Sequence, residues 1–528
     1  MMKQIFNFLS RSALCMALVV TSAASALAQQ RGGTLNMIVN PEPPTLMLGL
    51  NQLSGVQMVG GKIYQGLLTY DSNLNPQPGL AKSWTVSEDG LTYTFKLQEG
   101  VQWHDGKPFT SADVVFTTSK FLPEVHSRAR NNFSHLTSVT APDAATVVFK
   151  LKEPFAPFLG SFEVSSAPMV PRHIYEGTDF KANPANQTPI GTGPFKLKEW
   201  KKGSYIHLIR NDNYWKPGLP YLDGIYFQII PDSASRAVAL ESGKVDVSSF
   251  SDIELFDVNR FKTMPEFEVT NKGYEFLAPL AWIEFNNRSK PMDDKRFRQA
   301  VMYALDRTFI RDKIWFGHAK VATGPVSSAT RFYSADVKPY PLDLKKAEAL
   351  LDEMGLVKGK DGVRATIKLV GLPYGETWNR LSEYVRQSLG KVGLRVVIES
   401  TDAAGWTQRL ANWDFEMLVS YLTQYGDPAL GVSRTYLSSN IKKGIPYTNT
   451  AGYSNERVDE LFNKAAVAVK DEDRKRYYAD VQKLLVEDVP LGWLIEINFP
   501  TIYNKRVRNL VTTAIGVNES FDSVYLAK

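Results

Sequence analysis

Apolar residues recur at every second position from residue 91 to residue 97, the period of a strand with one buried face. Residues 146–151 repeat this period and predict a second strand. Between the two strands, Thr110 and Asp113 have the spacing of a capping box, in which each side chain accepts a hydrogen bond from the other residue's backbone. An apolar run begins at Val114, so a helix is expected there. The first third of the chain therefore predicts strands and helices in alternation.

Three later stretches carry apolar residues at spacings of three and four, the pattern of a helix with one buried face. We expect helices capped by Asp293 and Asp343, and a third that begins at Ser454. Their buried faces are Phe297, Ala300, Val301, Ala304 and Leu305; Ala347, Leu350, Leu351 and Met354; and Val458, Leu461, Phe462 and Ala465. A helical pattern over 377–390 runs into a β-branched strand over 395–399. The fold class is therefore mixed α/β.

The first 28 residues have the three parts of a secretory signal. Lys3 and Arg11 form the positive end, residues 13–20 the apolar run, and Ala26-Leu27-Ala28 the small-residue cleavage site. A retained membrane anchor is the alternative, but it needs about 20 apolar residues, and threonine and serine follow this run at once. We expect cleavage after Ala28, a mature protein that begins at Gln29, and a periplasmic location.

Length and charge narrow the class of protein further. A chain of 528 residues exceeds one compact core, so two or three lobes are expected. Loss of Lys3 and Arg11 lowers the basic count from 61 to 59 against 55 acidic residues, which leaves a net charge of +4. This mild charge is spread along the chain and gives no reason to expect a nucleic-acid partner.

The sequence offers no constellation that indicates catalysis, a metal or a cofactor. The only cysteine, Cys15, lies in the signal, which excludes disulfides, cysteine–zinc sites and a cysteine nucleophile from the mature chain. None of the six histidines is spaced three or four residues from another, and no G-x-S-x-G elbow occurs. Residues 191–194 read as a tight turn and residues 104–106 as a hairpin corner. A binding protein is favoured over an enzyme.

One long segment carries a family resemblance. The run AKSWTVSEDGLTYTFKL at residues 81–97, continued by residues 101–106 and 109–114, closely resembles the signature of the family 5 extracellular solute-binding proteins. These are the oligopeptide, dipeptide and nickel-binding proteins of ABC importers. Further matches follow in family order: Glu42–Leu46, Tyr64–Leu68, Gly191–Phe195, Arg210–Trp215, Phe285–Asn287, Phe297–Val301 and Asp306–Arg307. The resemblance thus covers essentially all of the mature chain.

The resemblance implies a two-lobe periplasmic binding protein fold of type II, in its large three-domain variant, with a hinge and a central ligand cleft. The first lobe is expected from residues 29–70, 189–273 and 495–528, the inserted domain from 71–188, and the second lobe from 274–494. Lobes of this kind close over their ligand about a hinge. The implied function is capture of a peptide-like solute by a monomer and its delivery to an ABC permease in the inner membrane.

The resemblance also implies where ligand binds. The matching segments are the loop after the first strand, the region upstream of an amphipathic helix in the second lobe, and the segment before Pro428. The expected ligand-binding residues are Leu53, Ser54, Gly55, Tyr374, Trp406, Tyr421, Gln424, Tyr425, Gly426 and Asp427. Plain core positions are the alternative for Trp406 and Tyr421, but a pocket is favoured because a large amphipathic ring suits a wet cleft.

The charges depart from the pattern of peptide binders. Gln424 stands where peptide-binding members carry an Asp for the ligand's amino group, and residues 371–375 lack the Arg that dipeptide binders place there for the carboxylate. A neutral amide can both donate and accept hydrogen bonds. A non-peptide solute, such as a sugar-containing or opine-like compound or a chelated metal, is therefore the alternative ligand. An exported hydrolase and a periplasmic chaperone are the alternatives from other classes.

Overall fold

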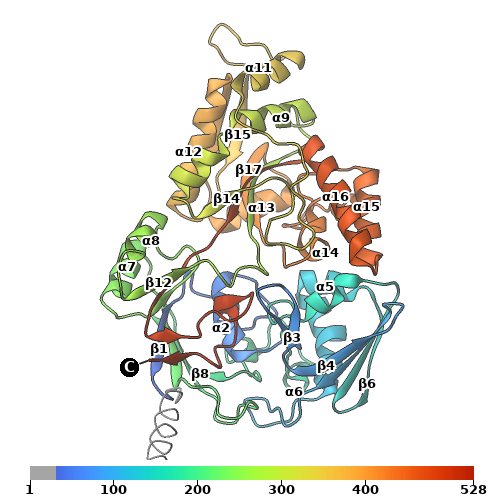
Figure 1. Cartoon of the computed structure of the whole chain (residues 1–528), viewed down its shortest axis with the longest axis vertical. Helices are drawn as coiled ribbons and strands as arrows, with labels where there is room; N and C mark the ends of the chain where they lie inside the picture. Colours follow the sequence, from blue (N-terminus) through green and yellow to red (C-terminus); the bar gives the residue numbers. More distant parts are fainter. Residues whose placement is uncertain (1–30, 528) are drawn as a thin grey trace, which may run out of the picture.

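The computed structural model describes residues 31–527 and contains three main sheets, each with its own helices (Figure 1). A seven-stranded sheet forms the first lobe, which is the lower body in Figure 1, in the order β12-β19-β11-β1-β10-β9-β8. Its strands are β1 (Thr34–Ile38), β8 (Phe195–Lys201), β9 (Tyr205–Arg210), β10 (Gly224–Gln228), β11 (Val247–Ser248), β12 (Phe267–Thr270) and β19 (Thr501–Asn504). Strand β1 pairs in parallel with both β10 and β11, and its apolar side chains are fully buried. Helices α2 (Ser54–Ile63), α7 (Ser233–Glu241) and α8 (Leu255–Phe261) belong to this lobe.

A four-stranded antiparallel sheet, in the order β4-β5-β7-β6, lies beside the first lobe. Its strands are β4 (Ala81–Val86), β5 (Thr92–Leu97), β6 (Leu136–Asp143) and β7 (Thr146–Leu151). Its other elements are β2 (Leu68–Tyr70), β3 (Pro76–Pro78), α3 (Ser111–Phe116), α4 (Leu122–Val125), α5 (Ser127–Phe133), the 3-10 helix η2 (Ala156–Phe162) and α6 (Arg172–Tyr175). Phenylalanines fill the core; Phe95 and Phe149, for example, pack edge to face with ring centroids 5.6 Å apart.

The third sheet, in the order β14-β18-β13-β17-β15-β16, forms the upper lobe (Figure 1). Its strands are β13 (Leu280–Phe285), β14 (Ala319–Val321), β15 (Ala365–Val370), β16 (Leu394–Glu399), β17 (Met417–Leu422) and β18 (Leu491–Ile497). Its helices are α9 (Lys295–Ala304), α10 (Arg307–Phe309), α11 (Leu344–Glu353), α12 (Glu376–Lys391), α13 (Ala403–Asn412), α14 (Pro428–Gly431), α15 (Glu456–Val467) and α16 (Asp471–Asp488). Helix α12 and strand β16 match the helix and strand predicted over 377–390 and 395–399, and the parallel pairing of β16 with β15 makes a β-α-β unit.

The predicted strands and helices are confirmed, with two corrections at helix starts. Thr110 and Asp113 form the predicted capping box, and the Thr110 N–H donates to Asp113 Oδ2 at 2.9 Å. Helix α9 is capped by Asp294 rather than Asp293, because it is the Asp294 side chain that accepts a hydrogen bond from the Arg296 N–H in the first turn, at 2.8 Å. Helix α15 is capped by Asn455 rather than by the neighbouring serine, because the Asn455 side chain accepts hydrogen bonds from the first turn.

The predicted buried faces agree with the structure except at the edge of α11. Residues on the apolar faces of α9 and α15 are buried. On α11, Ala347 and Leu351 are buried, whereas Leu350 and Met354 are only half-buried against the rim of the core. The apolar stripe of α11 is therefore narrower than the sequence predicts.

The predicted turn at residues 191–194 packs directly on the C-terminal end of α2. The Gly193 N–H donates to the Ile63 carbonyl at 2.8 Å, and a Cβ added to Gly191 would lie 1.9 Å from that oxygen. His104, at the predicted hairpin corner, donates its backbone N–H to the Gly191 carbonyl at 2.9 Å. The glycines here allow close backbone approach.

Two chain segments cross between the lower body and the upper lobe. One follows β12 and the other follows β18, and the Asn271 side chain joins them by donating to the carbonyls of Asn498 (3.0 Å) and Phe499 (3.2 Å). Strand β18 stays paired with β13 to Glu496, so the boundary expected between residues 494 and 495 falls inside a strand of the upper lobe. The predicted cleavage after Ala28 lies outside the described residues, and within 31–527 no helix is long and apolar enough to span a membrane.

Candidate functional site

Three segments that are far apart in sequence meet at Arg128 on α5. Its Nη2 donates to Gln52 Oε1 at 3.2 Å and to the Ser165 carbonyl at 2.9 Å. Its guanidinium carbon lies 3.4 Å from the centroid of the Tyr425 ring, in the loop after β17. Gln52 directly precedes Leu53 in the loop before α2. Two of the predicted ligand segments, one in each lobe, are thus joined through this side chain of the inserted domain.

The loop before α2 presents an apolar side chain and a close backbone contact. Leu53 is the N-cap of α2 and its side chain is 41% exposed, while Ser54 is half-buried. Gly55 is buried, and a Cβ there would lie 2.5 Å from the Pro41 carbonyl oxygen. The glycine therefore sets the backbone position of the loop, and Leu53 and Ser54 supply its accessible side chains.

An aromatic wall, defined as Tyr374, Trp378, Tyr421 and Phe499, lines the upper lobe beside this junction. Tyr421 stacks on Trp378 with centroids 5.4 Å apart and an interplanar angle of 17°. Its ring also lies 6.3 Å from Tyr374, which is 41% exposed, and 6.4 Å from Phe499 on the returning crossing segment. Burial first, and then the neighbouring phenols, raise the pKa of Tyr421, so its hydroxyl stays protonated and can donate or accept. Tyr374 and Tyr421 are among the residues expected from the sequence to bind ligand, whereas Trp378 and Phe499 are not, and contact of this wall with ligand stays a prediction.

The side chain of Gln424 is already engaged within the protein. Its Oε1 accepts from the Ser327 N–H at 2.9 Å and from Thr330 Oγ1 at 2.8 Å, and its Nε2 donates to the Pro325 carbonyl at 2.9 Å. Both lone pairs of Oε1 are therefore used, and one amide hydrogen remains. The structure gives Gln424 a role in fixing the loop 325–330, and its contact with ligand stays a prediction.

Asp427 also makes strong contacts within the upper lobe. Its two carboxylate oxygens accept from Arg474 Nη2 at 2.8 and 2.9 Å, and both side chains are buried. Oδ1 accepts from the Ala429 N–H at 3.0 Å as the cap of α14. Gly426 has a φ of +73°, a conformation that favours glycine. Asp427 and Gly426 thus shape the loop that presents Tyr425.

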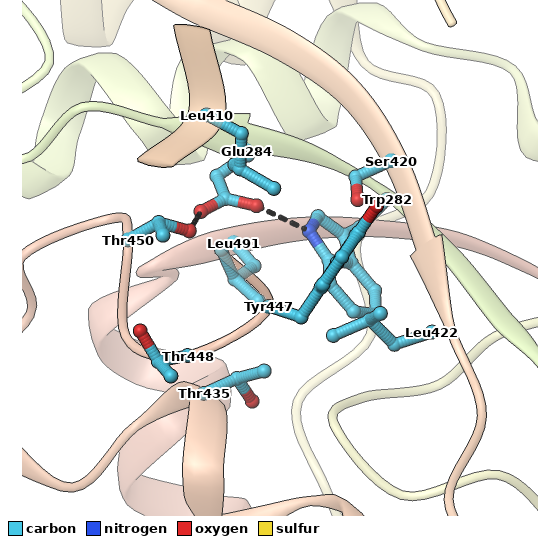
Figure 2. Close-up of a pocket in the computed structure, with 10 residues that line it drawn as sticks. All are labelled: Trp282, Glu284, Leu410, Ser420, Leu422, Thr435, Tyr447, Thr448, Thr450 and Leu491. Atoms are coloured by element: carbon cyan, nitrogen blue, oxygen red, sulfur yellow. Dashed lines mark hydrogen bonds between the residues drawn. The ribbon is translucent and has the colours of Figure 1, made fainter. Parts of the chain in front are cut away.

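Trp406 on α13 is buried, and within residues 31–527 no acceptor is found for its indole N–H. Its ring lies 6.3 Å from that of Tyr447. Tyr447 in turn borders an internal pocket of the upper lobe, shown in Figure 2. Trp406 therefore lies beside a residue that lines this pocket, and its contact with ligand stays a prediction.

The pocket in Figure 2 ends on the buried carboxyl group of Glu284. Glu284 accepts hydrogen bonds from Thr450 Oγ1 and, at 3.2 Å, from Trp282 Nε1. Burial raises the pKa of Glu284 to about 7, against the opposing effect of these hydrogen bonds and of Arg288. In this conformation the space between the lining side chains is too narrow to admit a water molecule. The junction between the lobes is therefore the better candidate for the ligand site.

No cluster of side chains that could bind a metal ion is found in the part of the chain that the structure describes. Among residues 31–527 there is no group of three or more His, Asp or Glu side chains placed to hold an ion. The features present are stacked aromatic rings, a buried guanidinium and backbone polar groups between two lobes. Aromatic side chains combined with a few placed polar groups are typical of the residues that line a site for a small solute. The fold and the site together define a two-lobe solute-binding protein.

Comparison with known proteins shows the family. Residues 75–444 match the model of the bacterial extracellular solute-binding proteins, family 5, and the chain belongs to this family. The oligopeptide-binding protein AppA of Bacillus subtilis is 30% identical over 498 residues, which are 89% of this chain and 87% of the relative.

Solved structures agree with this assignment. The ABC transporter-associated periplasmic binding protein DppA of Helicobacter pylori, in complex with the peptide STSA, is 26% identical with a TM-score of 0.81, covering 94% of this chain and 99% of that one. NikZ of Campylobacter jejuni, in complex with Ni(L-His), is 27% identical with a TM-score of 0.82, covering 92% and 97%. The chain is thus the solute-binding component of an ABC importer.

Proposed function

We propose that this protein is exported to the periplasm, captures a peptide-like solute at the junction between its lobes and delivers it to an inner-membrane permease. The observation that carries the proposal is the convergence of the Leu53 loop, Arg128 and Tyr425, with the aromatic wall beside them. Peptide backbones and flat rings pack well on aromatic side chains that keep a polar tip. Binding across two lobes favours the closed state, which the permease can distinguish from the open one.

A non-peptide solute is the second candidate, and Gln424 is the observation that favours it. Its side chain carries no charge for an amino group, and most of its hydrogen-bonding capacity is used by loop 325–330. The relatives span both chemistries, since DppA of Helicobacter pylori holds a peptide and NikZ of Campylobacter jejuni holds Ni(L-His). Either ligand is released unchanged, so no catalytic residue is proposed.

Mass spectrometry of protein purified from the periplasm tests the function. Under native conditions we expect the wild type to carry one small molecule, and Tyr421→Ala to lose it because the ring stacked on Trp378 is removed. Under denaturing conditions the same sample should have the mass of a chain that begins at Gln29 without lipid. Phe309→Ala, which removes a ring stacked on Tyr384 on the outside of the upper lobe, is the matched control and should keep the bound molecule. Retention by Tyr421→Ala, or a wild type without a bound molecule, would contradict the proposal.

A further inference from the structure

The guanidinium of Arg128 is buried with three of its five N–H donors unused. The side chain is only 8% exposed, and within residues 31–527 no acceptor lies within hydrogen-bond reach of Nε or Nη1. All of its hydrogen bonds come from Nη2, to Gln52 and Ser165. Buried polar groups are nearly always paired, and each exception calls for an explanation such as an absent ion or ligand.

A second arginine faces the same aromatic ring. The guanidinium carbon of Arg434 lies 5.7 Å from the centroid of Tyr425, whose ring is also covered by Arg128. Arg434 donates only to neutral carbonyls, from Nε to Gly431 and from Nη2 to Thr423, each at 3.1 Å. Burial first, and then Arg128, lower the pKa of Arg434, which shows that the two cations oppose each other.

No carboxylate of the described residues forms an ion pair with either arginine. Glu163 is near enough for Arg128 to act on it, but its carboxyl group accepts hydrogen bonds from Ser165 and Ser166. Burial outweighs these contacts and raises the pKa of Glu163. The neighbouring Gln424 is neutral, and Asp427 is held by Arg474. Even with Glu163 ionised, one carboxylate faces two arginines, so the arginine pair keeps an excess of positive charge.

The pKa of Tyr425 reflects this excess of positive charge. Burial alone would raise the pKa of its phenol, but Arg128, Arg434 and a hydrogen bond with Thr423 lower the pKa overall. Stacking on Tyr425 satisfies the face of the Arg128 guanidinium and stabilises contact between the inserted domain and the upper lobe. Stacking leaves the N–H groups of Nε and Nη1 without acceptors, and each of them can donate a charge-assisted hydrogen bond to an anion.

We propose that Arg128 and Arg434 form a subsite for an anionic group, a carboxylate, of the captured solute. The inference rests on the proposed capture of solute at the lobe junction and specifies the charge of the solute at that point. A carboxylate there would accept a charge-assisted hydrogen bond from an unused N–H of Arg128 and would bring a negative charge to both arginines. Because Arg128 comes from the inserted domain and Arg434 from the upper lobe, the same anion would join the two bodies as the lobes close.

Three peptides that differ only at one end test the subsite by calorimetric titration: succinyl-trialanine amide, acetyl-trialanine amide and trialanine amide. Wild type should bind the succinyl peptide at least about tenfold more tightly than the acetyl peptide, and the free amine should bind most weakly. In Arg128→Gln and in Arg434→Gln the preference for the succinyl peptide should fall to about twofold or less. Arg130→Gln, an exposed arginine on the same helix that donates to the Pro123 and Glu124 carbonyls, is the matched control and should keep the full preference.

A second measurement does not depend on whether the two arginine variants fold. The phenol of Tyr425, followed by ultraviolet difference titration against Tyr425→Phe, should titrate at higher pH when succinate is present, because the bound anion offsets the arginine charges. Sulfate added in place of succinate separates a subsite for carboxylate from one for any small anion. Equal affinities for the succinyl and acetyl peptides, together with an unchanged Tyr425 titration, would overturn the subsite. If the wild type still carries a solute in the native spectrum, that result leaves the proposed capture function intact.

Discussion

Asp427→Asn lowers the free energy of unfolding by about 3–5 kcal/mol, because it leaves the fully buried Arg474 without its charge partner. The substitution preserves the size of the side chain and the capacity to cap α14, since asparagine is as good an N-cap as aspartate. The loss therefore reports the buried ion pair rather than a cavity or a missing cap. Urea unfolding followed by tryptophan fluorescence measures it.

The control for this experiment is Glu99→Gln, which breaks an ion pair between exposed side chains, Lys82 and Glu99, 2.6 Å apart. Solvent screens such a pair, and its loss should cost much less stability than Asp427→Asn. A cost for Asp427→Asn no larger than that of the control would contradict the structural role assigned to Asp427. It would also return Asp427 to the set of side chains available to a ligand.

Glu284→Gln becomes more stable relative to wild type as the pH rises from about 4 to 8. The pKa of Glu284 is about 7 in the folded protein against 4.5 for the exposed group, so the folded state holds a proton that the unfolded state releases. Stability contributed by the protonated carboxyl is present below pH 4.5 and is lost as the pH rises through 7, a total of roughly 3 kcal/mol. Glutamine has no proton to lose and removes this part of the pH dependence.

Urea titrations of both proteins at several pH values measure the effect. Asp252, whose pKa burial raises to about 7, acts in the same direction in wild type and variant alike, so it cancels in the comparison. Glu99→Gln should show no such rise, because its ion pair with Lys82 lowers the pKa of Glu99. A difference between Glu284→Gln and wild type that stays constant with pH would show that Glu284 titrates normally.

Local pattern predicts the elements of this fold because each strand and helix buries one face. The capping box at Thr110 and the stripe on α9 follow from spacing alone. Cap positions were wrong by one residue at α9 and α15, since the turn before each helix decides which side chain reaches the first free N–H. The periodicity of the sequence does not show that distant segments share one sheet. The family resemblance supplied this part of the prediction.

The site was harder to predict because its contacts join distant parts of the chain. Arg128 and Arg130 stand two residues apart on α5, and nothing in the sequence distinguishes the buried arginine from the exposed one. The difference arises from packing of the inserted domain against Tyr425. In the same way, Asp427 looked available to ligand because Arg474, its partner, is 47 residues further along.

The central claim is that the two lobes close on a solute at the Arg128–Tyr425 junction, and small-angle X-ray scattering tests it most directly. Protein stripped of solute by reversible unfolding should have a larger radius of gyration than the same protein after solute extracted from the native preparation is returned. The scattering mass should remain that of one chain, and Tyr421→Ala should fail to contract. A wild type whose radius of gyration is unchanged by its own extracted solute would contradict the account.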